Sequence, residues 1–383
     1  MSQMKTAVSI CVFALLVAGC AWPGTAPTPT ARAVVERAAT QVPATVAATP
    51  TAEPTPTAVP TLEPAATQAG PAEYPVIEIP LSGPVAKQSA EVSGMAWYGD
   101  TLILLPQYPD FAAQEGDGAV YALPKADLLL YLQGALPGPL EPIAIPFVAP
   151  GLAATIEDFE GYEAIAFLGD QAFLTIEASP GREMKGYLVS GTMASDLSRL
   201  TVDTAVVTEI PVQARESNRS DETLLVVGGT IVTLYEVNGA ALNASPVAHL
   251  FDTDLNPRGT VPFPQIEYRI TDATEPDADG RFWAINYFFP GDEEQKVENE
   301  PLAGRYGQGP THAGHEAVER LVEFQYSDAG IRLIDAPPIQ LELIPILTRN
   351  WEGLVRLDDL GFLLVTDLFP VTILGFVPVP GGG

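Results

Sequence analysis

From Tyr74 onward, the chain alternates short apolar runs with polar breaks. The runs are about four to eight residues long and rich in Val, Ile, Leu, Phe and Tyr, and Gly, Pro, Asp and Asn separate them. Runs of this length and composition are typical of β-strands. A helical period extends beyond two turns only around residues 125–133 and 314–322, which are the two candidate helices. The pattern therefore predicts an all-β domain.

One unit recurs along this domain: a short strand, a tight turn and a second strand that ends in a polar or acidic residue. Its copies occupy residues 93–108, 159–178, 220–239, 271–292 and 350–370. The turns carry hairpin-type dipeptides, namely Gly99-Asp100, Gly169-Asp170, Gly228-Gly229, Asp279-Gly280 and Leu360-Gly361. Two further strand candidates follow the second copy and two follow the fourth, and a repeat of four strands is the signature of a β-propeller.

The number of copies indicates five blades, and their uneven spacing leaves six open. The last unit has only three strand candidates, the third of which lies within residues 372–379. The apolar run at residues 74–81 belongs to no unit. We therefore expect it to add the missing outer strand of the last unit, so that an N-terminal strand closes the propeller.

The first twenty residues resemble the leader of a bacterial lipoprotein. An apolar run at residues 7–18 has the length of a signal-peptide core and is too short to span a bilayer. It ends in Val17-Ala18-Gly19-Cys20, which resembles the lipobox, in which the cysteine is acylated. We expect a signal peptide over residues 1–19 and a lipid on Cys20 that anchors the protein to a membrane. The alternative is a plain secretory signal, in which the cysteine has no role.

The segment that follows is dominated by Ala, Thr and Pro. Proline at this density disfavours regular helix and sheet, and the segment has almost no large apolar side chains to bury. We expect a disordered stalk over residues 20–72 that reaches about 100 Å or more when extended. It would carry the propeller domain, residues 73–383, outside the cytoplasm, either at the cell surface or in the periplasm.

The chain is strongly acidic, with 48 Asp and Glu against 19 Lys and Arg and a formal net charge of −29. Nucleic-acid binding is excluded as a function because phosphate contacts need a surplus of cations. Divalent cations are the natural partners of such a chain, and the alternative is that the acidity only confers solubility.

Five segments resemble the repeats of the phytase-like β-propeller family, whose members are also described as having an esterase-like activity. The segments are residues 93–105, 158–167, 218–227, 270–286 and 350–370. Glu352-Gly353-Leu354 is similar to the family's Glu-Gly-Leu element, and Thr271-Asp272-Ala273 is similar to its Thr-Asp-Ala element. Ser93-Gly94-Met95 departs by lacking the acid, and Asp221-Glu222-Thr223 by lacking the glycine. The resemblance implies a propeller, often drawn with six blades, and a hydrolytic activity on esters.

The repeated hairpin also predicts where a site would lie. The start of its first strand and the end of its second strand share one edge, which rims the channel if the first strand is innermost. Carboxylates and amides are dense there, and oxygen-rich rings suit Ca²⁺. The candidate Ca²⁺ ligands are Asp158, Glu160, Glu177, Glu222, Asp272, Asn350, Glu352 and Asp367. The alternative is that these side chains cap loops and accept hydrogen bonds from backbone amides.

Four further residues are candidates for chemistry. His312 and His315 lie in a long connection between residues 289 and 319, where they would act as metal ligands or as a general acid or base, or else be exposed loop residues. Arg219 and Arg349 each precede a first strand and would clamp a phosphate. The alternative for the two arginines is an ion pair with Glu222 or Glu352.

Two functions remain open on the sequence alone. The first is a Ca²⁺-dependent hydrolase of phosphoesters or esters, in which metal ions bridge the substrate and a bound water. The second is a non-catalytic surface module that binds a small ligand or a protein through the propeller face. The absence of a Gly-x-Ser-x-Gly, Walker or dinucleotide motif leaves no recognisable nucleophile or cofactor signature.

Overall fold

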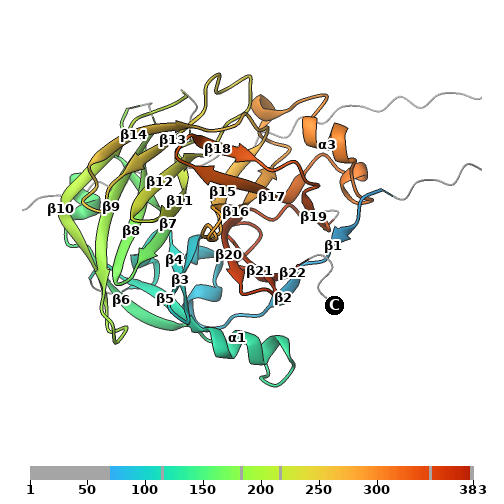
Figure 1. The fold of residues 1–383 in the computed structure, drawn as a ribbon. Coiled ribbons are helices and arrows are strands. Elements are labelled where there is room, and N and C mark those ends of the chain that lie inside the picture. The colour runs from blue at the N-terminus through green and yellow to red at the C-terminus, as the bar shows by residue number, and fades with distance from the viewer. Residues whose placement is uncertain (1–69, 114–115, 182–183, 215–217, 345–346, 380–383) are drawn as a thin grey trace, which may run out of the picture. The chain divides into compact units, whose positions relative to one another are not determined.

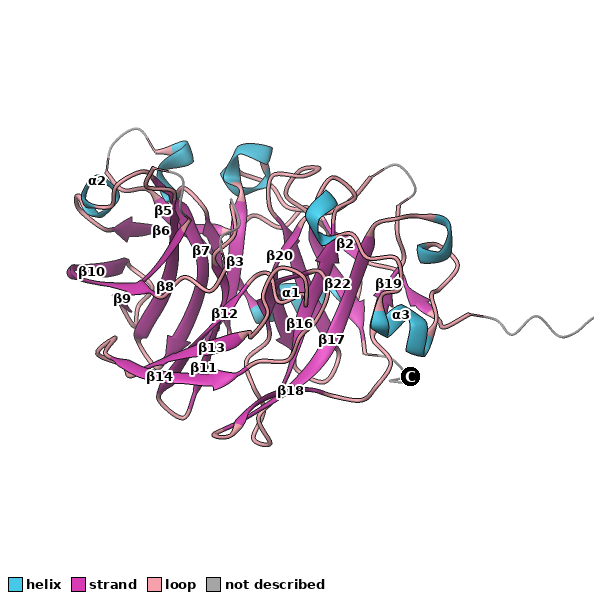
Figure 2. Cartoon of the chain, turned by 90° about the horizontal axis from the view of Figure 1, so that it is seen from above, coloured by secondary structure: helices cyan, strands magenta, loops and turns pink. Residues whose placement is uncertain are grey.

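The computed structural model describes residues 70–113, 116–181, 184–214, 218–344 and 347–379. The predicted signal peptide, Cys20 and almost all of the predicted stalk lie outside these residues. The described part consists mainly of strands, and its helices are short segments outside the sheets (Figure 2). The all-β prediction is therefore confirmed. No helix in the described residues is long and apolar enough to cross a membrane.

The described strands form four sheets, the largest of which joins two antiparallel units through a short parallel pairing of β6 (Ile143–Val148) with β10 (Leu200–Ile210). Five antiparallel units are thus placed around a common centre (Figure 1). The first strand of each unit is the innermost one. These inner strands are β3 (Val92–Tyr98), β7 (Phe159–Leu168), β11 (Asp221–Val227), β15 (Arg269–Ala273) and β20 (Trp351–Leu357). Each inner strand contacts the next in this order, and β20 contacts β3. This closed ring is the architecture of a β-propeller, as the repeats predict.

The remaining strands follow outward from the ring. The second strands are β4 (Thr101–Pro106), β8 (Gln171–Ala178), β12 (Thr230–Tyr235), β16 (Arg281–Phe288) and β21 (Gly361–Thr366). The third strands are β5 (Ala119–Pro124), β9 (Lys185–Met193), β13 (Val247–Phe251), β17 (Val318–Ser327) and β22 (Leu374–Pro378). The outer strands are β6 (Ile143–Val148), β10 (Leu200–Ile210), β14 (Pro257–Pro262), β18 (Gly330–Leu333) with β19 (Ile339–Leu341), and β2 (Ile77–Ile79).

The N-terminal part of the domain closes the last unit. Strand β2 pairs antiparallel with β22, with Ile77 opposite Phe376. The predicted closure by an N-terminal strand is therefore confirmed. Just before it, β1 (Glu73–Tyr74) pairs parallel with β19 of the fourth unit. The start of the domain is thus held by two neighbouring units.

Apolar side chains fill the spaces between neighbouring units. Ile103 of the first unit packs in one cluster with Phe167 of the second, and Val232 of the third unit shares a cluster with Phe324 of the fourth. Because both faces are covered in this way, an inner strand such as β7 can carry consecutive buried apolar residues, at positions 164–167.

This two-sided burial explains the outcome for the two candidate helices. The segment at residues 125–133 forms α1 (Lys125–Leu132), as expected. The segment at residues 314–322 was a wrong prediction because β17 begins at Val318. Leu321 packs against the fifth unit and Val322 against the third, so apolar residues face both sides of the strand and imitate a helical pattern. The other α-helices are α2 (Leu152–Thr155) and α3 (Pro301–Tyr306).

The inner strands share a β-bulge near their start. In β20, Trp351 pairs with Thr366 and Gly353 with Val365, so Glu352 has no opposite residue. Glu160 of β7 and Glu222 of β11 occupy the same bulged position. Because a bulge changes the direction of a side chain, the repeat's acidic residue is turned out of the regular ladder.

The glycine that follows this acid in two of the units has a steric reason. A Cβ on Gly353 would lie 2.6 Å from Val365 Cγ1 and 3.0 Å from Met95 Cγ. The Glu-Gly element therefore combines a bulge with the close approach of neighbouring inner strands.

Candidate functional site

Carboxyl groups from the second, third and fifth units gather at the end of the ring where the inner strands begin. We name six of them the carboxylate cluster: Glu163, Glu177, Glu222, Glu236, Glu352 and Asp367. Two of them, Glu352 and Asp367, are half-buried, and the other four are buried. The hairpin geometry brings five of them together because each lies near the start of a first strand or the end of a second strand, and Glu163 lies in the middle of β7.

Arg269, at the start of β15, lies among these carboxyl groups. Its Nε contacts Glu236, and its Nη2 is 3.7 Å from Glu222 Oε2 and 3.5 Å from Glu352 Oε1. Its Nη1 donates a hydrogen bond of 3.4 Å to Asn350 Oδ1, and its guanidinium lies over the Tyr287 ring. Arg269 is therefore within ion-pair distance of three carboxyl groups of the cluster, and Arg219 also lies 3.7 Å from one of them, Glu236.

Burial and mutual repulsion raise the pKa values of several carboxyl groups of the cluster. Burial, with repulsion from Glu236, raises the pKa of Glu177 to about 8. Burial likewise raises the pKa of Asp367 to about 6, and it raises the pKa of Glu352 well above its usual range together with repulsion from Asp367. The cause is that a charged carboxylate loses its hydration in the cluster while other carboxylates repel it. Several of these groups therefore hold protons near neutral pH.

Four oxygens of the cluster have no hydrogen-bond partner among the described residues. They are Glu177 Oε1, Glu222 Oε2, Glu236 Oε2 and Asp367 Oδ1. A buried carboxylate oxygen without a partner is costly unless a proton or a cation neutralises it. The oxygens have the chemistry that Ca²⁺ prefers. However, no group of three or more His, Cys, Asp or Glu side chains in the described residues is placed to hold a metal ion. Ca²⁺ binding therefore stays a prediction.

One pocket opens at each end of the ring. The pocket near the cluster has largely apolar walls. We name it the aromatic pocket, and its volume is about 410 Å³. Its lining residues are Arg269, Tyr287, Phe289, Leu347, Thr348, Asn350, Phe369 and Pro370. Asn350 also donates hydrogen bonds to Glu352 Oε1 at 2.5 Å and to Asp367 Oδ2 at 3.4 Å. Arg269 and Asn350 therefore belong both to the pocket wall and to the edge of the cluster.

The structure brings five of the eight predicted Ca²⁺ ligands together: Glu177, Glu222, Asn350, Glu352 and Asp367. Glu160 lies at their margin, where it accepts a hydrogen bond from the Ser179 hydroxyl.

The other two predicted ligands, Asp158 and Asp272, have different surroundings. Asp158 is exposed on a left-handed turn with φ of 50°, before the bulge that redirects Glu160. Asp272 is buried, and its Oδ2 accepts a hydrogen bond of 2.7 Å from the backbone N–H of Leu354. It fastens β15 to β20, which matches the alternative of backbone hydrogen bonding for this one residue.

Both candidate phosphate-binding arginines are buried in ion pairs. Arg219 lies 3.2 Å from Asp292 and 3.7 Å from Glu236, so it attaches the long connection after β16 to the ring. Arg349 pairs with Glu319 at 2.7 Å and lies over the Trp351 ring. The ion pair between Arg349 and Glu352 was a wrong prediction, because Arg349 pairs with Glu319 at the start of β17 instead.

The two histidines occupy different environments. The His312 ring is buried, with Nδ1 2.8 Å from Glu73 Oε1 and Nε2 accepting a hydrogen bond from the Glu319 backbone N–H. It therefore connects β1 to the long connection. His315 is exposed on the wall of a separate, smaller pocket. A role for either histidine in catalysis stays a prediction.

Sequence reasoning missed Arg269 and Glu163 and did not select Glu236 as a ligand. Arg269 had a signal, because it stands before a first strand just as Arg219 and Arg349 do. Glu163 lies inside an apolar strand, three residues after Glu160, and no pattern distinguishes it. Its carboxylate accepts a hydrogen bond of 2.9 Å from Gln107.

The raised pKa of Glu177 predicts how stability depends on pH. Between its ordinary value of 4.5 and about 8, the folded chain holds a proton that the unfolded chain has lost. Raising the pH through this window therefore favours the unfolded state. We expect the unfolding free energy, measured with denaturant and a metal chelator, to fall from pH 5 to pH 8.

The variant Glu177→Gln should flatten this slope by up to about 1.4 kcal/mol per pH unit. Glu157→Gln, which alters an exposed carboxylate, is the matched control and should leave the slope unchanged. A wild-type protein equally stable at pH 5 and pH 8 would contradict the burial of protonated carboxyl groups.

Comparison with solved structures finds similar folds at low sequence identity. The catalytic domain of a Coprinopsis cinerea GH62 α-L-arabinofuranosidase matches with a TM-score of 0.43 and 8% identity, over 80% of this chain and 97% of its own. A Clostridium thermocellum α-L-arabinofuranosidase matches with a TM-score of 0.42 and 11% identity, over 71% of this chain and 81% of its own. A GH130 family structure matches with a TM-score of 0.42 and 10% identity, over 82% and 95%. No family model and no curated protein matches the sequence. The similarity to these structures concerns the fold alone.

Proposed function

We propose that this chain is an extracytoplasmic β-propeller of the phytase-like type, anchored by a lipid on Cys20, that hydrolyses an ester or phosphoester at the carboxylate cluster. One observation carries the proposal: Arg269 and Asn350 line the aromatic pocket and also bond to the cluster. A ligand in the pocket would therefore lie one side chain away from Glu352 and Asp367.

These two carboxyl groups are suited to acid–base catalysis. Asp367, with a pKa of about 6, is mostly ionised at pH 7, whereas burial and repulsion from Asp367 raise the pKa of Glu352 well above its usual range. Asp367 would take the proton of the attacking water, and Glu352 would give a proton to the leaving oxygen. Arg269 Nη1, which uses one of its two hydrogens on Asn350, would donate the other to the oxygen on which negative charge develops.

The charge of the carboxylate cluster determines which substrates need a counter-cation to bind. A phosphoester brings negative charge to a place where carboxyl groups outnumber the arginines, so it would be repelled without a counter-cation. Ca²⁺ is the predicted counter-cation. A neutral carboxylic ester has no such requirement.

The alternative function is a non-catalytic module that binds a ligand through the same face. It is favoured by the pairing of Arg219 and Arg349, which leaves neither guanidinium free to hold a phosphate.

Turnover assays on the full chain in detergent test the proposal, with short-chain carboxylic esters and phosphomonoesters offered with Ca²⁺ or with chelator. Phosphoester turnover should need Ca²⁺, and carboxylic ester turnover should not. Asp367→Asn should lower kcat about 100-fold or more with little change in KM, because it removes the base. Asp203→Asn, an exposed site on β10, is the matched control. If these compounds bind without turnover, the proposed hydrolase function is wrong and the non-catalytic binding function takes its place.

The lipid anchor is tested by cell fractionation. Cys20→Ser should move the protein from the membrane to the soluble fraction, because the thiol that carries the acyl chains is gone. Cys11→Ser removes the chain's other cysteine and should leave the protein at the membrane. Mass spectrometry showing a mature wild-type protein without acyl chains would refute the anchor.

A further inference from the structure

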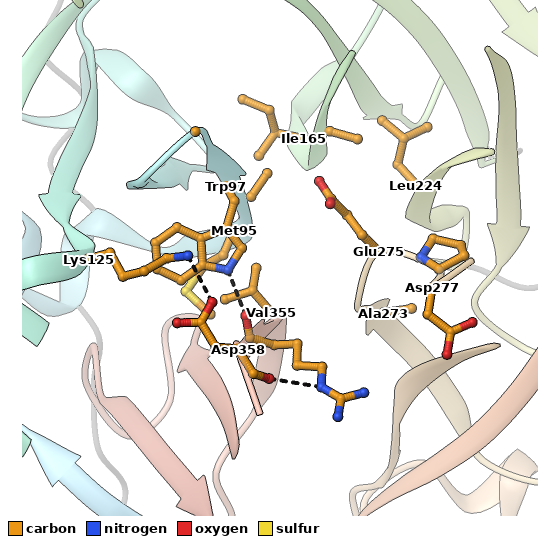
Figure 3. A pocket seen from close by; sticks show the side chains of 15 residues that line it. Met95, Trp97, Lys125, Ile165, Leu224, Ala273, Glu275, Asp277, Val355 and Asp358 are labelled. Carbon is orange, nitrogen blue, oxygen red and sulfur yellow. Dashed lines mark hydrogen bonds and ion pairs between the residues drawn. The ribbon is translucent and has the colours of Figure 1, made fainter. Parts of the chain in front are cut away.

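A second pocket lies at the opposite end of the ring from the carboxylate cluster. We name it the channel pocket, and its volume is about 390 Å³ (Figure 3). Each of the five inner strands contributes one apolar residue to its floor: Met95, Ile165, Leu224, Ala273 and Val355. The rim is formed by the turns that follow the inner strands. Because an apolar layer separates it from the cluster, this pocket is independent of the proposed hydrolase site.

One wall of the channel pocket is a fixed indole. The Trp97 N–H donates a hydrogen bond of 2.8 Å to the Arg356 carbonyl, which joins the first unit to the fifth. Lys125 Nζ lies 4.8 Å from the centre of the Trp97 ring and 3.0 Å from Asp358 Oδ1. Figure 3 shows these side chains together on one side of the pocket.

Almost all charged groups of the pocket already have protein partners. Lys125 pairs with Asp358, and the Arg356 guanidinium donates to the Asp358 carbonyl. Asp277 accepts hydrogen bonds from the backbone N–H groups of Asp279 and Arg281 within its turn. These groups therefore need no ligand.

Glu275 is the exception. Among the described residues, it makes no hydrogen bond and no ion pair, and its carboxylate points into the pocket toward Ile165 (Figure 3). The backbone around it is held: the Thr274 N–H donates to the Trp283 carbonyl at 2.8 Å, and Pro276 restricts the backbone of Glu275 before it. The Glu275 side chain is exposed, so its carboxylate reaches solvent at the edge of an apolar floor without a counter-charge.

We propose that the channel pocket binds a small organic ammonium ion, with its charged group beside Glu275 and its apolar body over the floor and against Trp97. The volume suits a ligand of small-molecule size. A single carboxylate matches one ammonium group, whereas a divalent metal ion needs several oxygen ligands. The negative charge of the whole chain raises the local concentration of cations.

Titration calorimetry with three probes of similar shape tests the proposal on the full chain. 2-Phenylethylamine is an ammonium ion at pH 7, 2-phenylethanol is neutral and 3-phenylpropionate is an anion. The ammonium probe should bind at least about tenfold more tightly than the neutral one, and the anion should bind most weakly. Equal affinity of the ammonium and neutral probes would overturn the proposal.

Three variants locate the binding. Glu275→Gln should weaken the ammonium probe about tenfold or more and leave the neutral probe unchanged, and it should fold normally because Glu275 has no partner to lose. Glu78→Gln, an exposed site on β2, makes the same change of charge elsewhere and should have no effect. Glu352→Gln changes a residue of the carboxylate cluster and tests whether the ammonium probe binds there instead of in the channel pocket. Affinity that falls with Glu352→Gln but not with Glu275→Gln would refute the channel pocket without bearing on the hydrolase.

Discussion

Electrostatic repulsion among the six carboxyl groups of the carboxylate cluster destabilises the end of the ring where the inner strands begin. Arg269 counters it by contacting Glu222, Glu236 and Glu352 at once. Burial and repulsion also raise the pKa values of Glu177 and Asp367. Groups with raised pKa values bind protons more readily, and this protonation lowers the remaining charge. The ring can hold these groups together because apolar clusters between neighbouring units and the N-terminal strand β2 fix the inner strands.

The Glu-Gly element of the inner strands helps to place the carboxyl groups of the cluster. An acid at the bulged position leaves the ladder, and the glycine after it lets the next inner strand approach. At the far end of the inner strands, Met95, Ile165 and Val355 contribute to an apolar floor. The ring therefore has one end rich in carboxyl groups and one end with an apolar floor.

The sequence was sufficient for the features that depend on local pattern. Apolar runs, hairpin turns and the unassigned run at residues 74–81 predicted the propeller and its closing strand, because strands and turns leave regular signals. It was insufficient where the partner comes from another unit. Asp272 looks like its neighbours in the repeat but bonds to the Leu354 backbone, and Arg349 meets Glu319 rather than Glu352. Arg269 was missed because only the ring shows that it faces three carboxylates from two other units.

Replacement of Arg269 by methionine tests this account most directly, because it keeps much of the side-chain volume and removes the charge. The measurement is the loss of unfolding free energy at pH 5 and at pH 8 in the presence of chelator, with Arg332→Met at an exposed site as the control. If Arg269 is the counter-charge, the loss should be larger at pH 8 by about 1.4 kcal/mol or more, since more carboxyl groups are ionised there. An equal loss at the two pH values would show that Arg269 acts only through packing, and the electrostatic account would be wrong.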